Sequence, residues 1–237
     1  MDGMAANLRS DRSARAGAFF DMDKTLIAEN SGSVYMKARY ARGDVSRLEL
    51  LRGLADYLRY KAGALDLLGW TREAMKEFAG TDESALAADA RALFHEAIEE
   101  LIYPEAVNLV KGHLAQGHVV AIVSGSTRYL VEPLAESLGV EHALCTSLEV
   151  EDGVLTGRVV EPICFEEGKV FWLREFIATH HVDLARSYFY TDSVTDLPLL
   201  ELVGHPVAVN PDPRLYGVAI WRRWPVRIFS SPSGAAG

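Results

Sequence analysis

The stretch Ala18-Phe19-Phe20-Asp21-Met22-Asp23-Lys24-Thr25-Leu26 decides the fold that the sequence predicts. Its first three residues are apolar and predict a short buried strand, which ends at two carboxylates, Asp21 and Asp23. Two carboxylates this close repel each other unless a cation or a proton lies between them, and Mg²⁺ prefers oxygen ligands. A solvated turn would also accommodate both aspartates. Because apolar residues flank the pair on both sides, we favour a cation-binding site over a solvated turn.

The composition limits the classes of protein to which the chain can belong. It has 237 residues, 49% of them hydrophobic, which is enough for one large domain or for one domain with a smaller one. A net charge of -9 without a basic stripe argues against a nucleic-acid partner.

Cys145 and Cys164 lack zinc-ligand spacing, so we expect buried free thiols. Without a membrane-length apolar run or an apolar signal core, we expect a cytoplasmic protein with no membrane partner.

The middle of the chain predicts an inserted helical domain. Strand-like runs disappear over residues 33–101, where apolar residues recur at helical spacing and Asp82 or Thr81 can cap a helix. A segment of this size can form a small lid. We therefore predict a catalytic core at 18–32 and 102–229, an all-helical cap at 33–101, and flexible tails at 1–17 and 230–237.

Two further buried strands are expected at 118–123 and 187–190, and both end in polar loops. The first is followed by Ser124-Gly125 and a helix, and the second by Asp192 and Asp196. This alternation predicts an α/β fold with a doubly wound, Rossmann-like parallel sheet. Ligands of such sheets bind outside the carboxyl ends of the strands, so the acidic and polar loops are expected to meet at one site.

Several other segments have their own patterns. Alternation around Asp152-Gly153 predicts a β-hairpin over 148–159, and Gly168-Lys169 opens an amphipathic helix. Residues 206–209 predict a further strand. The basic aromatic run Trp221-Arg222-Arg223-Trp224 is short and lacks a lipid-anchor motif, so a closing strand or amphipathic turn is favoured over contact with a membrane.

The residue types at the strand ends suit phosphoryl transfer. Asp21, Asp23 and Asp192 offer oxygen ligands for one Mg²⁺, which proteins usually share with a substrate phosphate. The loop Ser124-Gly125 can hold phosphate oxygens, and Lys169 supplies the cation that an acidic protein needs there. One carboxylate can act as nucleophile, and a second can protonate the leaving alcohol and then accept a proton from water.

Four motifs in order resemble those of the haloacid dehalogenase (HAD) superfamily. Residues 20–26 are similar to its first motif, 123–126 to the second, Lys169 to the third and 192–198 to the fourth. The helical insert and the Asp-Gly hairpin resemble the phosphoserine-phosphatase-like branch, which carries a helical cap. The likeness spans roughly residues 18 to 213.

The resemblance implies a Mg²⁺-dependent phosphatase that hydrolyses a small phosphomonoester through an aspartyl-phosphate. In that family Asp21 would be the nucleophile and a metal ligand, and Asp23 the general acid/base with its backbone carbonyl on the metal. Asp192 would be a direct metal ligand, and Asp196 would support the metal through water or through Lys169. Ser124, Gly125 and Lys169 would bind the phosphate, and Thr25 would brace the loop.

One position departs from the family pattern. Where the related enzymes carry a glutamate that contacts the substrate amine, this chain has Asn30, with Glu29 one residue earlier. We therefore expect phosphoserine to be a poor substrate or to be recognised through Glu29, and another small phosphorylated metabolite such as histidinol phosphate remains open. A receiver-like phospho-Asp signalling protein is the alternative of a different class, but Asp23 and the long insert argue against it. The oligomeric state and the phosphoryl acceptor, water or an alcohol, are also open.

Overall fold

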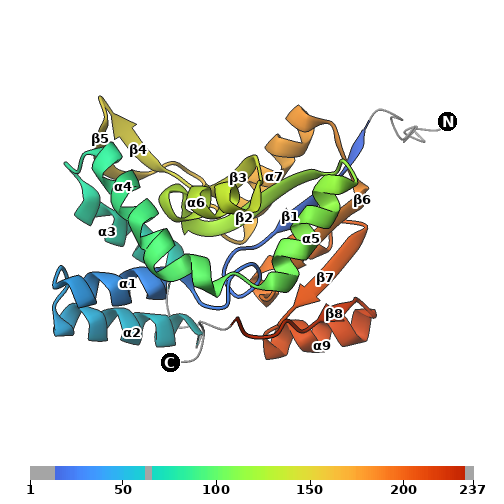
Figure 1. Cartoon of the computed structure of the whole chain (residues 1–237), viewed down its shortest axis with the longest axis horizontal. Helices are drawn as coiled ribbons and strands as arrows, with labels where there is room; N and C mark the ends of the chain where they lie inside the picture. Colours follow the sequence, from blue (N-terminus) through green and yellow to red (C-terminus); the bar gives the residue numbers. More distant parts are fainter. Residues whose placement is uncertain (1–13, 62–65, 233–237) are drawn as a thin grey trace, which may run out of the picture.

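The core of the molecule is a six-stranded sheet in which every neighbouring pair is parallel. The computed structural model describes residues 14–61 and 66–232. Figure 1 shows the sheet order β3-β2-β1-β6-β7-β8. The strands are β1 (Arg15–Phe20), β2 (Val119–Thr127), β3 (His142–Thr146), β6 (Val182–Thr191), β7 (His205–Val209) and β8 (Val226–Arg227).

Helices cover both faces of the sheet, because successive strand residues point to opposite sides. Phe20 stacks on Tyr190 with ring centroids 4.6 Å apart, on the face covered by α5 (Pro104–Ala115) and α6 (Arg128–Leu138). Its neighbour Phe19 meets Phe176 of α7 on the other face. That second face carries α7 (Glu167–His180), α8 (Leu197–Leu200) and α9 (Pro213–Arg222). The predicted doubly wound α/β fold is confirmed.

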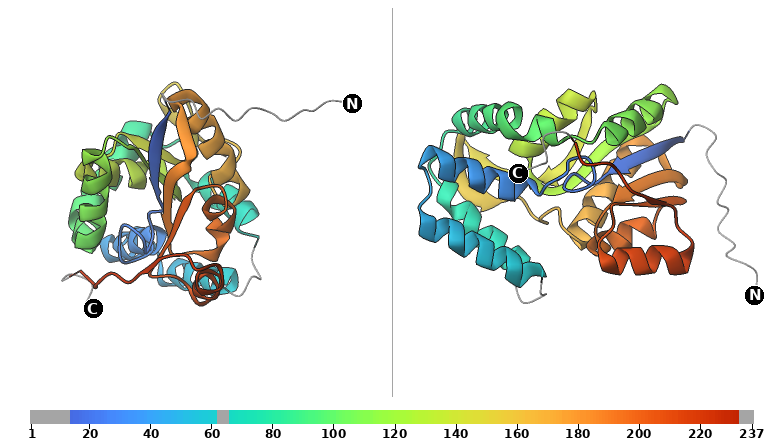
Figure 2. Two further views of the ribbon diagram at one scale, coloured as in Figure 1. Left: turned by 90° about the vertical axis from the view of Figure 1, so that its right-hand side faces the viewer. Right: turned by 60° about the horizontal axis from the view of Figure 1, so that its bottom comes forward.

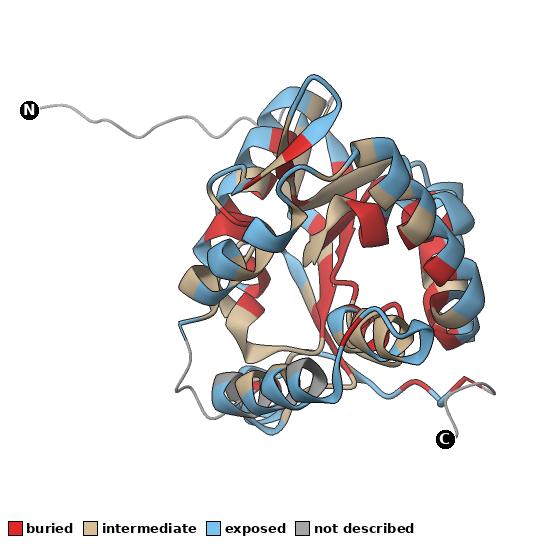
Figure 3. Cartoon of the chain, turned by 90° about the vertical axis from the view of Figure 1, so that its left-hand side faces the viewer, coloured by how far each residue is buried: buried red, intermediate tan, exposed pale blue. Residues whose placement is uncertain are grey.

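The chain reverses its direction of winding beside β1. It proceeds from β1 to β2 and β3 on one side, and then places β6 against the other side of β1. The crevice at such a switch point, outside the carboxyl ends of the strands, is where open α/β sheets bind ligands. Figure 3 shows the buried central strand from the end of the molecule that carries the helical insert.

The predicted insert is helical and lies beyond the carboxyl ends of β1 and β2 (Figures 1 and 2). It begins at Ser31, two residues before the predicted boundary, because Asn30 accepts a hydrogen bond from the Ser33 amide as the N-cap. Asp82 is the cap of a later helix, as predicted. The elements are α1 (Ser31–Arg42), α2 (Arg47–Lys61), α3 (Leu67–Met75), η1 (Lys76–Phe78), α4 (Glu83–Leu93), η2 (Phe94–Ile98) and η3 (Glu99–Leu101).

The hairpin predicted around Asp152-Gly153 is present as β4 (Leu148–Glu151) and β5 (Val154–Val159). It packs on the insert rather than on the large sheet. The Gly80 amide donates to the Leu155 carbonyl at 2.9 Å, and the Leu155 amide donates to the Thr81 carbonyl at the same distance. The hairpin therefore extends the helical insert, although the sequence placed it within the core range 102–229.

Some predicted boundaries need correction. Strand β1 starts at Arg15, so the predicted tail at 1–17 overlaps it, while residues 1–13 and 233–237 lie outside the described residues. The last described residues, 230–232, follow Phe229, which is buried against Tyr103. Cys145 and Cys164 are free thiols, as expected, and Cys164 is buried. Within the described ranges, no helix combines the length and apolarity needed to cross a membrane.

The prediction of a closing strand or turn at Trp221-Arg222-Arg223-Trp224 is wrong. Asp212 caps a helix that begins at Pro213, and this helix continues through Trp221 to Arg222. Arg223 then ends it in the left-handed region, at φ 57°. Strands β3 and β8 were also not predicted, because neither stands out as a long apolar run.

Candidate active site

Asp21 lies at the carboxyl end of β1, in the crevice beside β6. Its amide donates to the Tyr190 carbonyl at 2.9 Å, which fixes the backbone where the strand ends. Its side chain accepts a hydrogen bond from the Lys169 ammonium, with Nζ 2.7 Å from Oδ1. Asp21 is only 7% exposed, so this carboxylate is held in one place inside a mostly enclosed site.

Lys169 reaches the site from the first turn of α7 and is 4% exposed. Its ammonium also lies 2.9 Å from Oδ2 of Asp196, so it bridges two carboxylates. The glycine before it is required by close packing, because a Cβ at Gly168 would lie 1.8 Å from the Ile163 carbonyl oxygen. The start of α7 is thereby pressed against the preceding loop, and the lysine is aimed into the crevice.

Asp23 is held by the first helix of the insert. Its Oδ1 accepts a hydrogen bond from the Ser31 amide at 2.9 Å, and its Oδ2 accepts one from Nδ2 of Asn30 at 2.7 Å. The loop between them turns sharply, with Lys24 at φ 57° and the Met22 carbonyl accepting from several following amides. The sequence analysis did not predict these contacts, which join the core motif to the hinge of the insert.

The polar loop after β2 is a bulged continuation of that strand rather than a separate loop. The register with β3 shifts between Ser124 and Thr127, so Gly125 and Ser126 leave the regular ladder. The Ser124 hydroxyl accepts from the Ser126 amide at 3.1 Å. The hydroxyls of Ser126 and Ser31 lie 2.5 Å apart, which brings the start of α1 against this loop.

The acidic loop after β6 completes the cluster. Asp196 is buried, and the Thr191 hydroxyl donates to its Oδ2 at 2.7 Å. Asp212, from the loop after β7, accepts a hydrogen bond from the Val194 amide, and its own amide donates to the Asp192 carbonyl at 2.7 Å. Thr191 and Asp212 therefore position the metal-binding candidates, a role that the sequence analysis did not assign to them.

The environment of these carboxylates opposes their ionisation. Burial raises the pKa of Asp21 to about 7, against the attraction of Lys169. Burial and the neighbouring Asp21 raise the pKa of Asp192 to about 8, and burial also raises the pKa of Asp23. Burial alone would lower the pKa of Lys169, but Asp196 and Asp21 together outweigh it and raise that pKa. Lys169 is thus the shared counterion of Asp21 and Asp196.

The donor set fits a hard divalent cation. The Oδ1 atom of Asp196 is buried without a hydrogen-bond partner, and the carboxylates of Asp21, Asp23, Asp192 and Asp196 outnumber the nearby lysines, Lys169 and Lys24. No group of three His, Cys, Asp or Glu side chains among the described residues is arranged to hold a metal. A site with two carboxylates, Asp21 and Asp192, and the backbone carbonyl of Asp23 needs no group of three acidic side chains, and both side-chain oxygens of Asp23 already accept hydrogen bonds.

The structure brings the predicted residues to one end of the sheet, and it also gives the contacts of Asn30 and Glu29. Asn30 is engaged with Asp23 and with the Ser33 amide, and Glu29 forms a surface ion pair with Lys37 at 2.9 Å. The Asn30 amide thus already has partners, whereas Glu29 is partly exposed and its recognition of a substrate amine stays a prediction. The Thr25 hydroxyl is buried and without a hydrogen-bond partner among the described residues.

Comparison with known proteins gives relatives over most of the chain. A family model described as haloacid dehalogenase-like hydrolase matches residues 18–201. The probable phosphatase Rv3661 of Mycobacterium tuberculosis is 38% identical over 92% of this chain and 77% of that protein. The phosphoserine phosphatase SerB1 of the same organism is 32% identical over 93% and 73%, and a histidinol-phosphatase of Neisseria meningitidis is 32% identical over 90% and 98%.

A solved structure has the same architecture. The crystal structure of a Bordetella pertussis protein, described as having unknown function, superposes with a TM-score of 0.82 at 33% identity. The likeness covers 91% of this chain and 99% of that one. The likeness to a structure determined by experiment therefore extends over most of the chain.

Proposed function

Since the chain belongs to the haloacid dehalogenase-like hydrolases, we propose that it is a Mg²⁺-dependent phosphatase that hydrolyses a small phosphomonoester through an aspartyl-phosphate. The predicted family and its phosphoserine-phosphatase-like character are confirmed by the family match and by the relatives named phosphatase. The observation that carries the proposed mechanism is the placement of Asp21 and Lys169, 2.7 Å apart, in the crevice beside the held carboxylate of Asp23.

The first half-reaction begins at Asp21. A carboxylate oxygen of Asp21 attacks phosphorus, the bond from phosphorus to the ester oxygen breaks, and Asp23 gives its proton to the departing alcohol. Because burial raises the pKa of Asp23, its carboxyl group is suited to hold that proton before transfer. Ser124, the Gly125 amide and Lys169 hold the phosphoryl oxygens as their charge develops.

The second half-reaction uses the same residues. Asp23 accepts a proton from water, the water oxygen attacks phosphorus, and the acyl-phosphate bond breaks. This releases inorganic phosphate and restores the carboxylate of Asp21, so no atom or electron is left unaccounted for. The hydrogen bonds from the Ser31 amide and Asn30 keep Asp23 in one orientation through both steps.

Asp21, Asp192 and the backbone carbonyl of Asp23 would hold the metal, with Asp196 behind them. When bound, Mg²⁺ supplies positive charge that stabilises the transferring phosphoryl group. Lys169 and Asp196 keep the nucleophile in place from the other side, since Lys169 bridges both carboxylates. Thr191 orients Asp196 by its hydrogen bond of 2.7 Å.

The insert is positioned to cover this site. Besides the contacts of α1 with Asp23 and Ser126, Glu83 at the start of α4 pairs with Arg128, directly after the polar loop. Two helices of the insert thus approach the phosphate-binding loop from different directions. This arrangement supports a cap that excludes bulk water while the phospho-enzyme forms.

A panel of phosphorylated metabolites tests the proposal. In the presence of Mg²⁺ and not in excess chelator, the purified protein should release inorganic phosphate from at least one small phosphomonoester of a panel that includes phosphoserine and histidinol phosphate. Quenched reactions should contain an acid-stable, base-labile phosphoryl group on the protein, as expected of an acyl-phosphate. Absence of phosphate release from every ester, including p-nitrophenyl phosphate, would remove the proposed activity.

A further inference from the structure

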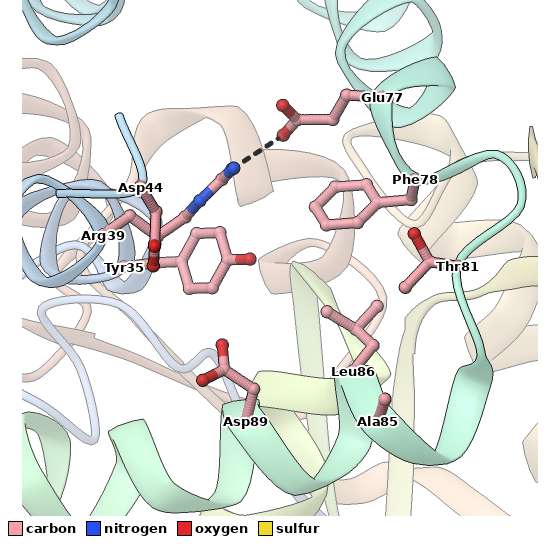
Figure 4. A pocket seen from close by; sticks show the side chains of 9 residues that line it. All are labelled: Tyr35, Arg39, Asp44, Glu77, Phe78, Thr81, Ala85, Leu86 and Asp89. Atoms are coloured by element: carbon pink, nitrogen blue, oxygen red, sulfur yellow. Dashed lines mark hydrogen bonds and ion pairs between the residues drawn. The ribbon is translucent and has the colours of Figure 1, made fainter. Parts of the chain in front are cut away.

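A cavity of about 310 Å³ that is largely open to solvent lies on the helical insert, between α1, η1 and α4. A cavity of this size is within the range that binds small molecules. Two aromatic side chains, Tyr35 and Phe78, line it together with aliphatic residues of α4. Figure 4 shows the Tyr35 hydroxyl pointing into the space between Phe78 and Leu86.

The cavity is aligned with the catalytic site through α1. Ser31, Tyr35 and Arg39 are spaced by four residues, so they lie on one face of this helix. The Ser31 amide binds the Asp23 carboxylate, while Tyr35 and Arg39 line the cavity. At 1.5 Å per residue, Tyr35 and Arg39 lie about 6 and 12 Å along the helix axis from Ser31, whose amide contacts Asp23.

The second helix that lines the cavity also starts beside the phosphate-binding loop. Glu83 in the first turn of α4 pairs with Arg128 and accepts a hydrogen bond from the Tyr129 hydroxyl. Leu86 and Asp89, three and six residues after Glu83 on the same helix, line the cavity. Both helices that line the cavity therefore begin beside loops of the catalytic site.

The charged residues around the cavity are predominantly acidic. Three of the lining residues, Asp44, Glu77 and Asp89, carry carboxylates, and one, Arg39, carries a positive charge. The Arg39 guanidinium forms an ion pair with Glu77 at 3.0 Å. Asp89 pairs with Arg42, a residue that is not part of the lining. No side chain in the described part of the chain pairs with the Asp44 carboxylate.

Tyr35 lies among these carboxylates. Burial raises the pKa of its hydroxyl, and Asp89, Glu77 and Asp44 all act in the same direction. The Arg39 guanidinium lies over its ring, 5.5 Å from the centroid. The Tyr35 hydroxyl points into the cavity, and the carboxylate of the exposed Asp44 also lines it.

We propose that this cavity binds a positively charged nitrogen, an ammonium or imidazolium, at the far end of the leaving group. The inference rests on the proposed phosphatase function and specifies its substrate class: a phosphomonoester whose cationic group is separated from the ester by a spacer of several atoms. Asp44 supplies the charge, Tyr35 accepts or donates a hydrogen bond, and the aromatic walls hold the spacer. The Arg39 charge is already neutralised, so a carboxylate finds no free cation there.

Matched substrates test the proposal. The kcat/KM for 5-aminopentyl phosphate should exceed that for n-pentyl phosphate by about tenfold, the usual value of one charge-assisted contact. The short 2-aminoethyl phosphate should have no such advantage over ethyl phosphate, because its nitrogen does not reach the cavity. Asp44→Asn and Tyr35→Phe should each reduce the preference, and Asp44→Lys should shift it to an ester with a terminal carboxylate.

A matched control is available on the same insert. Glu73 is an exposed carboxylate that pairs with Lys76 and does not line the cavity. Glu73→Gln should leave the ratio of the two kcat/KM values unchanged. Equal kcat/KM for the aminoalkyl and alkyl esters in the wild type, or a preference that persists in Asp44→Asn and Tyr35→Phe, would overturn the assignment of the cavity.

The two proposals fail in different ways. If the wild type hydrolyses p-nitrophenyl phosphate and alkyl phosphates without discriminating the terminal charge, the phosphatase function stands and the cavity inference is wrong. If it hydrolyses none of them, the phosphatase function itself is wrong. Binding of 5-aminopentyl phosphonate, a non-hydrolysable analogue, then decides the cavity separately: weaker binding to Asp44→Asn than to the wild type supports it, and equal binding refutes it.

Discussion

Nδ2 of Asn30 donates a hydrogen bond of 2.7 Å to Oδ2 of Asp23, so the residue that caps the first helix of the insert also holds the proposed acid/base. Asn30→Ala should lower kcat on alkyl phosphates by about tenfold, because a hydrogen bond to a charged group is lost. Loss of the cap should also lower the free energy of unfolding by about 1 kcal/mol. Steady-state kinetics and urea unfolding measure the two effects.

A second capping residue provides the control for Asn30. Asp82 caps α4 in the same manner, 3.0 Å from the Ala85 amide, but contacts no catalytic residue. Asp82→Ala should therefore lower stability similarly and leave kcat unchanged. A similar fall of kcat in both variants would mean that Asn30 acts only through the stability of the insert.

Asp21→Asn should abolish turnover while the fold survives. Asn is nearly isosteric but cannot form the acyl-phosphate. The amide oxygen can still accept the hydrogen bond from Lys169, so the unfolding midpoint should change little. Hydrolysis of p-nitrophenyl phosphate and trapping of the phospho-enzyme check the prediction, and substantial activity in a clean preparation of the variant would remove Asp21 from its role.

Asp23→Asn should slow hydrolysis by about two to four decades, the usual contribution of a general acid/base. Alkyl phosphates should suffer more than aryl phosphates, because a poor leaving group depends more on protonation. The comparison of kcat on the two classes of ester is the measurement. An equal loss on both classes would show that Asp23 does not act as an acid.

Binding of Mg²⁺ should affect both the turnover and the stability of the protein. Chelation should abolish turnover, and Mg²⁺ should restore it while Ca²⁺ does not, because Ca²⁺ takes more ligands at longer distances. At about a hundred times its dissociation constant, Mg²⁺ should stabilise the fold by about 2.7 kcal/mol. Asp192→Ala should remove both effects, whereas Asp152→Asn at the tip of the hairpin should retain them. Full activity in excess chelator would refute metal dependence.

The main features of the catalytic end were predictable from the sequence because they depend on local patterns. Apolar runs locate the strands, and the convergence of parallel strand ends then brings Asp21, Ser124 and Asp192 together without further information. The contact of Asn30 with Asp23 depends on how the chain turns between these two positions, seven residues apart, and the contact of Asp212 with the acidic loop joins segments 18 residues apart. Such contacts depend on the register of one element against another, which periodicity does not specify.

Of two features that were not predicted, only helix α9 had a visible signal in the sequence. Asp212-Pro213 is a typical helix start, with a capping side chain followed by proline at the first helical position, and it predicts α9. The aromatic run at 221–224 obscured it. The placement of the hairpin on the insert had no such signal, because the hydrogen bonds that join Leu155 to the Gly80 amide and to the Thr81 carbonyl span more than seventy residues of chain.

The last prediction concerns a buried histidine beneath the site. Nε2 of His113 lies 2.8 Å from the Tyr190 hydroxyl, and its Nδ1 lies 2.7 Å from Nδ1 of His118. Burial, then the charges of His118 and Arg227, lowers the pKa of His113 from 6.5 to about 4. The unfolded chain therefore binds this proton first as the pH falls. The contribution of His113 to stability is complete above pH 6.5 and is lost between pH 6.5 and 4.

Between pH 7.5 and pH 5, this linkage should lower the free energy of unfolding by about 2 kcal/mol in the wild type. His113→Gln keeps a hydrogen-bonding side chain but cannot titrate, so its loss over the same interval should be smaller by about that amount. His95, an exposed histidine paired with Glu99, provides the control, and His95→Gln should behave as the wild type. Urea unfolding at the two pH values measures all three proteins. An identical pH dependence in wild type and His113→Gln would show that His113 does not couple protonation to the fold.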